Sequence, residues 1–103
     1  MNQKELLIIF RKTDGKCFYC GSGEAFDVDH FFPRAKANEY GEELIGNLDI
    51  LENRFLACQN CNSKKKDKFP EDFIENAWER YDWANIKAGI MPVFLTILSA
   101  FKT

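Results

Sequence analysis

The sequence lacks an excess of basic charge. Its 103 residues carry 14 Lys and Arg against 16 Asp and Glu, which gives a formal net charge of -2. A domain that attracts nucleic acid through its overall charge is strongly basic, so this class is excluded and any nucleic-acid contact must come from a local patch. Histidine is scarce as well, because His30 is the only one. Any chemistry that needs an imidazole therefore falls on this one position.

Long hydrophobic runs are also missing. The apolar residues 6–10 are too few for a secretory signal, and two basic residues follow them directly. No stretch approaches the roughly 20 apolar residues of a membrane span, since residues 93–101 reach about half that length. We therefore expect no membrane association and a cytoplasmic location, in which thiols stay reduced.

The length of the chain predicts a single domain, residues 1–103. A domain of this size buries a modest core and often depends on a bound metal for stability. Ten phenylalanines predict that the core is rich in aromatic rings. We expect three parts: an N-terminal helix (1–16), a metal-bracketed centre (17–68) and a C-terminal helical extension (69–103).

Four cysteines stand in two pairs, Cys17-x-x-Cys20 and Cys58-x-x-Cys61. A two-residue spacer lets both sulfurs of a pair point at one ion, and four thiolates form the closed tetrahedral set of a structural zinc. Two independent redox pairs or four buried thiols are the alternatives, but matched pairs in a reducing compartment favour zinc. The interval between the pairs is longer than in a minimal zinc ribbon, so the intervening segment should carry a function of its own.

The first helix is predicted to run from Asn2 to a turn at residues 14–15. Asn2 and Glu5 resemble a capping box, and Leu6, Ile9 and Phe10, with Leu7 beside them, fit one helical face. Further along, the pattern predicts a strand over residues 25–32, a loop with a helical turn over 34–46, a short strand or turn over 48–51, and a helix over 62–66.

One continuous helix is predicted from Pro70 to about Ala88. Proline suits the first helical position, the two acids that follow suit the N-terminal end of the dipole, and Gly89 supplies a stop. A last segment, residues 93–101, is apolar nearly all round and should be buried. A homodimer through these C-terminal helices is therefore a hypothesis.

Three polar positions are set by their distance from the cysteines or by their neighbours. His30 follows Asp29, Asn53 lies five positions before the second cysteine pair, and Asn62 directly follows that pair. Each has an ordinary interpretation, because a lone His beside an Asp is usually a satisfied surface or core residue and a lone Asn is usually a cap or a turn. Taken together, the order Asp29-His30-x-x-Pro33, then Asn53-x-x-x-x-Cys58-x-x-Cys61-Asn62-x-Lys64, resembles the HNH endonuclease family.

The resemblance implies an α+β fold with a ββα-metal core, in which two short strands and a helix surround one catalytic ion. Asp29 and Asn62 would hold that ion, magnesium or manganese, and His30 would be the general base. Asn53 would hold the loop between the strands and orient His30, although Asn47 competes with it for this role. The four cysteines would hold a separate structural zinc. Position 62 is His in many members, and the loop after Pro33 lacks a Gly-Gly pair that is often present.

The chemistry of the side chains agrees with this implication. Histidine is the side chain whose ordinary pKa suits a base near neutral pH, and a hard cation prefers the oxygens of Asp29 and Asn62. Adjacent residues of a strand point to opposite faces, so Asp29 and His30 reach one site only if the strand bends or ends there.

The densest basic run directly follows the proposed metal ligand, at Lys64, Lys65, Lys66 and Lys68, and Arg34 and Lys36 follow the first strand. We expect Arg34, Lys64 and Lys65 to contact DNA phosphates, while a solvated helix face is the alternative. The acids at 71, 72, 75, 79 and 82 should face away from DNA.

The rival functions are a nucleic-acid-binding module that is held together by zinc but has no catalytic activity, and a protein-interaction domain that docks a partner through its apolar C-terminal segment.

Overall fold

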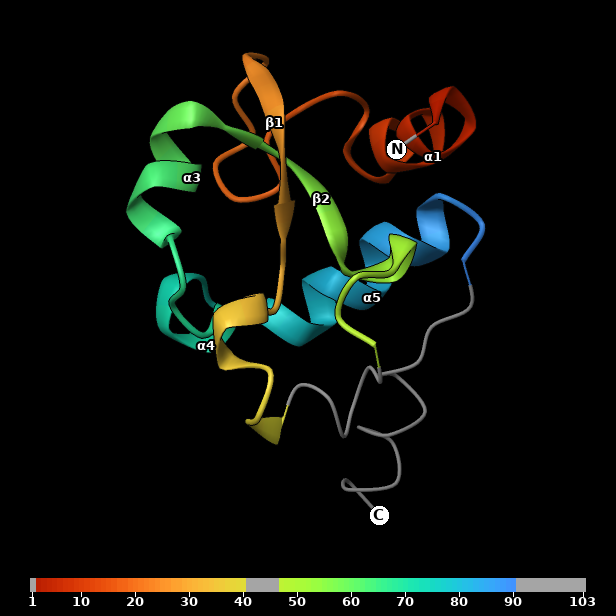
Figure 1. Ribbon diagram of the computed structural model, residues 1–103. Coiled ribbons are helices and arrows are strands. Elements are labelled where there is room, and N and C mark those ends of the chain that lie inside the picture. The colour runs from red at the N-terminus through yellow and green to blue at the C-terminus, as the bar shows by residue number, and fades with distance from the viewer. Residues whose placement is uncertain (1, 41–46, 91–103) are drawn as a thin grey trace.

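The structure is a computed structural model, and it describes residues 2–40 and 47–90 (Figure 1). The predicted segment 93–101 and the dimer proposed through it lie outside these residues. None of the described helices is long and apolar enough to cross a membrane. The elements in order are α1 (Gln3–Thr13), β1 (Ala25–His30), the 3-10 turns η1 (Arg34–Lys36) and η2 (Leu51–Asn53), β2 (Arg54–Cys58), α3 (Gln59–Lys65), α4 (Pro70–Phe73) and α5 (Ala77–Lys87).

The two strands pair antiparallel as one two-stranded sheet. Val28 lies opposite Leu56, and the register is irregular between Ala25 and Asp27. Helix α3 packs beside β1 and α1 packs beside β2, so helices flank both strands (Figure 1). The α+β class and the ββα core of the prediction are confirmed, with a helix before the core and helices after it.

The sequence pattern did not locate the second strand. Residues 48–51 were expected to form a short strand or turn, and the turn is the alternative that holds, because this stretch is bent and runs into η2. The strand is β2, which follows at Arg54–Cys58. The four residues from Phe55 to Cys58 are all buried, so the strand has no polar alternation to reveal it. The first strand also ends at His30, two residues earlier than predicted, and a bend follows.

Aromatic rings fill the core, as the phenylalanine content predicted. Phe18 packs against Phe55 with ring centroids 4.3 Å apart, and Phe31 packs against Tyr81 at 5.0 Å and Trp78 at 5.1 Å. Edge and tilted ring contacts of this kind add to the stability that burial alone supplies. The core therefore joins Phe31, which directly follows β1, to β2, α3, α5 and the loop that carries the first cysteine pair.

Helix α1 begins and ends as predicted. The Asn2 Oδ1 accepts a hydrogen bond from the Glu5 backbone N–H at 2.8 Å, and Asp14 and Gly15 both take positive φ angles at the C-terminal end. The predicted apolar face is mostly not buried: Ile9 is inaccessible, but the other three large apolar side chains are about half exposed, namely Leu6 (45%), Leu7 (50%) and Phe10 (51%).

A buried lysine fastens α1 to the second strand. The Lys12 Nζ donates hydrogen bonds to the carbonyl oxygens of Leu51 and Arg54 at 2.6 and 2.9 Å, and it lies 4.3 Å from the centroid of the Phe55 ring. Burial lowers the pKa of Lys12 to about 7, although the Glu52 charge opposes the shift. This side chain therefore joins α1 to both ends of the short segment that holds Asn53.

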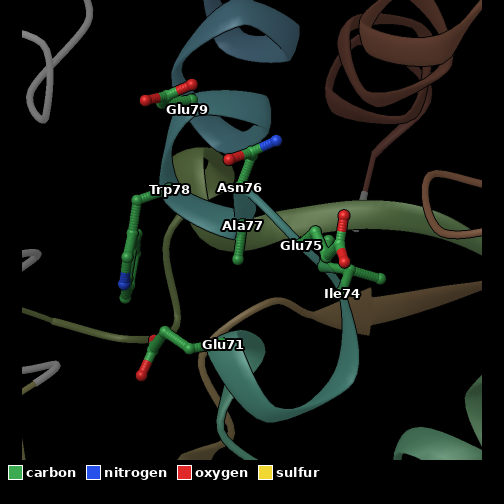
Figure 2. A pocket seen from close by; sticks show the side chains of 7 residues that line it. All are labelled: Glu71, Ile74, Glu75, Asn76, Ala77, Trp78 and Glu79. Carbon is green, nitrogen blue, oxygen red and sulfur yellow. The ribbon is translucent and has the colours of Figure 1, made fainter.

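The predicted helix from Pro70 to Ala88 is two helices. Helix α4 ends at Phe73, Ile74 is extended, and Asn76 takes a left-handed conformation (φ 53°) before α5 begins. Asparagine tolerates that conformation better than most residues, and the break changes the direction of the chain. The break borders a pocket of ≈ 280 Å³ (Figure 2). Its lining residues are Glu71, Ile74, Glu75, Asn76, Ala77, Trp78 and Glu79.

The acidic surface predicted to face away from DNA is smaller than expected. Glu71, Glu75 and Glu79 are exposed around the pocket of Figure 2. Asp82, in contrast, is fully buried in α5 and belongs to the interior.

Candidate active site

The four cysteines meet in space. Their sulfur atoms all lie within 4.8 Å of one another, and the Sγ atoms of Cys20 and Cys58 are 3.7 Å apart. Four sulfurs in a tetrahedron around zinc at about 2.3 Å lie about 3.8 Å from each other, so the arrangement fits this ion. In the part of the chain that the structure describes, this is the one cluster of three or more Cys, His, Asp or Glu side chains with such geometry. The predicted gathering of the four cysteines within metal-binding distance is confirmed.

The cysteine cluster joins two parts of the chain that lie far apart in the sequence. Cys17 and Cys20 lie in a loop without regular structure, whereas Cys58 ends β2 and caps α3. The Phe18 backbone N–H between the first two cysteines also bonds to the Leu56 carbonyl at 2.9 Å. The cluster therefore fixes the first loop to the β2–α3 junction.

Asp29 points into the interior beside α3. Its side chain is about nine-tenths buried, and its Oδ2 accepts a hydrogen bond from the Tyr19 hydroxyl and lies 3.2 Å from the Lys65 Nζ. Burial and the Asp29 charge raise the pKa of Tyr19, so its hydroxyl stays a donor. Tyr19 stands between the two cysteines of the first pair, which links that pair directly to the carboxylate.

Lys65 is the second partner of Asp29 and is completely buried. It also donates to the His30 carbonyl at 2.9 Å, and burial lowers its pKa. The sequence pattern predicted that Lys65 would contact DNA, but its ammonium faces inward and does not reach the surface. The sequence could have indicated this inward position, because Lys65 lies three residues after Asn62 and so shares the helical face of the proposed metal ligand.

Asn62 lies on that same face of α3, and its partner is a second carboxylate of β1. The Asn62 Nδ2 donates to Asp27 Oδ2 at 3.2 Å. Asp27 and Asp29 lie two residues apart on the strand and so share one face. The structure thus brings the oxygens of Asp27, Asp29 and Asn62 to the α3–β1 interface, and Asp27 was not foreseen from the sequence.

His30 points to the opposite face of β1 from Asp29. It is paired with Arg54 across the sheet, whereas Asp29 is paired with the core residue Phe55. The His30 Nε2 lies 3.0 Å from the Asp49 Oδ1, and the strand ends at His30. The strand does end at His30, but the His30 ring and the Asp29 carboxylate lie on opposite faces of β1, so the structure does not bring the two side chains together. Asp49 is a neighbour of His30 that no sequence pattern indicated.

Asn53 ties together the two ends of the segment between the strands. Its side chain is fully buried, accepts from the Phe32 N–H at 2.8 Å, and donates to the carbonyls of Phe32 and Leu48 at 3.1 and 2.8 Å. Asn47 is exposed and instead accepts from the Asp49 backbone N–H at 2.9 Å. Of the two candidates, Asn53 is the one that holds the loop.

Comparison with known protein families shows which family this arrangement of residues belongs to. The family model described as HNH endonuclease matches residues 17–68, half of the chain. The chain belongs to the HNH endonuclease family. The match spans both cysteine pairs, Asp29, His30, Asn53 and Asn62, while α1 and α5 lie outside it. No curated protein matches the chain.

The oxygen donors of this HNH domain suit a hard divalent ion. Carboxylates and amide oxygens are the ligands that magnesium prefers, and two or three of them leave positions for water and substrate. The Asn62 Nδ2 donates one hydrogen bond to Asp27, and its Oδ1 is the atom that can bind a cation. The Asp29 carboxylate is also paired with the Lys65 ammonium, whose positive charge lies 3.2 Å from the Asp29 Oδ2.

Basic side chains are exposed at two places in the matched region, after α3 and in η1. Lys64, Lys66 and Lys68 are exposed at and after the end of α3, and Arg34 is exposed in η1. The Lys36 Nζ lies 4.7 Å from the centroid of the Phe69 ring, so this lysine is held against an aromatic face. These side chains, without Lys65, are the candidates for the local basic patch that nucleic-acid contact would require.

Proposed function

We propose that this HNH protein is a metal-dependent endonuclease that hydrolyses the phosphodiester bonds of DNA. The observation that carries the proposal is the α3–β1 interface, where the side-chain oxygens of Asp27, Asp29 and Asn62 lie on the strand that ends at His30 and on the adjoining helix. The four clustered cysteines hold this interface within one domain. A nuclease function in general follows from the family, and the particular substrate and residue roles are our proposal.

Asp29 and Asn62 would hold a magnesium or manganese ion, and the cysteines would hold a structural zinc. When bound, the divalent ion supplies positive charge to the phosphoryl oxygens and to the leaving oxygen. Tyr19, Lys65 and Asp27 hold the two ligand side chains in place, as partners behind metal ligands commonly do.

His30 would act as the general base. It takes a proton from a water molecule whose oxygen forms a bond to phosphorus. The bond from phosphorus to the 3′ oxygen breaks, and that oxygen takes up a proton from solvent. The products are a 5′-phosphate end and a 3′-hydroxyl end. Asn53 supports the step indirectly, because it holds Phe32 two residues after the base.

Plasmid nicking in the presence of magnesium or manganese tests the proposal. We expect the wild-type protein to convert supercoiled plasmid, and His30→Ala to reduce the rate on the order of 10²- to 10⁴-fold, the usual contribution of a positioned base. The matched metal-ligand variant, Asn62→Ala, should instead raise the metal concentration needed for half-maximal rate.

The same assay addresses the rival functions. Wild type and His30→Ala that are equally inert across a metal panel and several DNA substrates would overturn the nuclease proposal. In that case a protein-interaction role gains support from the exposed side chains of α1, where Leu6, Leu7 and Phe10 with Gln3 line a groove of ≈ 360 Å³. We place either function in the cytoplasm, where the thiols remain available for the metal.

DNA would be held through its backbone by the exposed lysines after the motif. Neutralising Lys64 and Lys66 together, as glutamines, should weaken DNA binding and flatten its salt dependence by about one unit of slope for each phosphate that is no longer neutralised. Fluorescence anisotropy over a salt series measures this slope.

The control for the lysine pair is the double variant Lys4→Gln with Arg11→Gln on α1, which removes the same charge from the helix that flanks the other strand (Figure 1). Equal slopes for both double variants would show that the patch makes no specific contribution. A slope that changes only for the α3 lysines would support it.

A further inference from the structure

We propose that Asp49 is a positioning residue that fixes the tautomer of His30, so that Nδ1 is the ring nitrogen that accepts the proton from water. This inference rests on the proposed nuclease function for its role in catalysis. Its structural half, the tautomer, stands without that function and is tested separately below.

The contact between Asp49 and the ring dictates the tautomer. The Asp49 Oδ1 lies 3.0 Å from the His30 Nε2. An ionised carboxylate only accepts hydrogen bonds, so Nε2 must carry the hydrogen of the neutral imidazole. The lone pair then sits on Nδ1, and this nitrogen alone can take up a proton.

Asp49 itself is held in place from three sides. The Arg54 guanidinium lies 2.7 Å from its Oδ1 and 3.4 Å from its carbonyl oxygen, and Asn47 accepts from its backbone N–H at 2.9 Å. The hydrogen bonds from Arg54 and from His30 lower the pKa of Asp49 to about 2, so the carboxylate is ionised at any pH near neutral. The Asp49 carboxylate is thereby kept ionised, although it is exposed to solvent.

Arg54 is anchored in turn by the first helix. Its Nη1 lies 3.2 Å from the Glu5 Oε2, and its side chain is mostly buried. A chain of contacts therefore runs from Glu5 through Arg54 and Asp49 to His30. It gives α1, which lies outside the family match, a role in orienting the base.

Asp49→Asn tests the role in catalysis, because an amide of the same size can pair with either tautomer. At saturating metal and DNA we expect kcat to fall about 10- to 100-fold, part of the ~10²- to 10⁴-fold effect of the base itself. The metal concentration for half-maximal rate and the Kd for DNA should be unchanged. Asp49→Glu, which keeps the carboxylate, should retain more activity, and Asp72→Asn on α4 is the matched control.

A double-mutant cycle separates positioning from general stability. If Asp49 acts through the ring, Asp49→Asn should cost nothing further in the His30→Ala background. An equal loss in both backgrounds, or a loss matched by Asp72→Asn, would overturn the proposed role.

The tautomer can be measured without any cutting, because the chain has one histidine. Nitrogen-15 NMR of the neutral imidazole should show the hydrogen on Nε2 in the zinc-loaded wild type and a mixture of tautomers in Asp49→Asn. A hydrogen on Nδ1 in the wild type would overturn the inference even if the protein cuts DNA. A protein that cuts no DNA but shows the Nε2–H tautomer would overturn the proposed function and support the structural inference.

Discussion

Removal of the zinc is expected to unfold the domain. The first cysteine pair lies in a loop without helix or strand, and the second pair joins β2 to α3. Binding of a structural zinc to four thiolates contributes on the order of 10 kcal/mol or more, which is comparable to the whole stability of a domain of this size. Without the ion, the loop that carries Phe18 and Tyr19 is no longer tied to the β2–α3 junction. These two rings then no longer cover one side of the aromatic core.

Circular dichroism melts with and without a strong chelator measure this effect, and Cys61→Ala should reproduce it at saturating zinc. Ser22→Ala is the matched control, because Ser22 lies in the same loop and only its hydroxyl, which accepts from the Glu24 N–H, is removed. Return of the folded signal on adding zinc back would support the expectation. Unchanged melting after complete removal of the metal would contradict it.

Replacement of Lys65 by methionine is the second change with a large expected effect. Methionine fills a similar volume, but it leaves the Asp29 carboxylate buried with the Tyr19 hydroxyl as its remaining hydrogen-bond donor, and it leaves the His30 carbonyl without its lysine. Removal of one partner of a buried ion pair typically costs about 3–5 kcal/mol. We therefore expect Lys65→Met to lower the free energy of unfolding by about this amount in denaturant titrations.

Lys64→Met supplies a close control, because it removes the same charge from the neighbouring position, where the side chain is exposed. Its effect should be within about 0.5 kcal/mol of zero. The double variant Asp29→Asn with Lys65→Met should lose less than the sum of the two single variants, since no buried charge is then left unpaired. Equal stability of Lys64→Met and Lys65→Met would contradict the buried position of Lys65.

The parts of the site that could be predicted are those encoded by short spacings. Two Cys-x-x-Cys pairs indicated one cluster, and the order of Asp29, His30, Asn53 and Asn62 around them indicated the family to which the chain belongs. The cap at Asn2 was also readable, because its donor lies three residues away on the same helix.

Elements whose signal depends on their surroundings were misplaced. Strand β2 is buried along almost its whole length, so it shows no alternation, and the helix after Pro70 breaks at Asn76 although its apolar spacing continues through the break. Local spacing describes which face of an element could be apolar, but it does not show where the chain must turn to pack Trp78 and Tyr81 against Phe31.

The sequence by itself determined the cysteine cluster, the family and the presence of one histidine beside one carboxylate, because these depend on residue type and on spacings of a few positions. Only the tertiary structure decided which groups surround them: Lys65 and Tyr19 at Asp29, Asp27 at Asn62, and Asp49 at His30. Each of these contacts joins residues at least ten positions apart in the chain. Their distances are set by how β1 packs against its neighbours, and no local pattern encodes that packing.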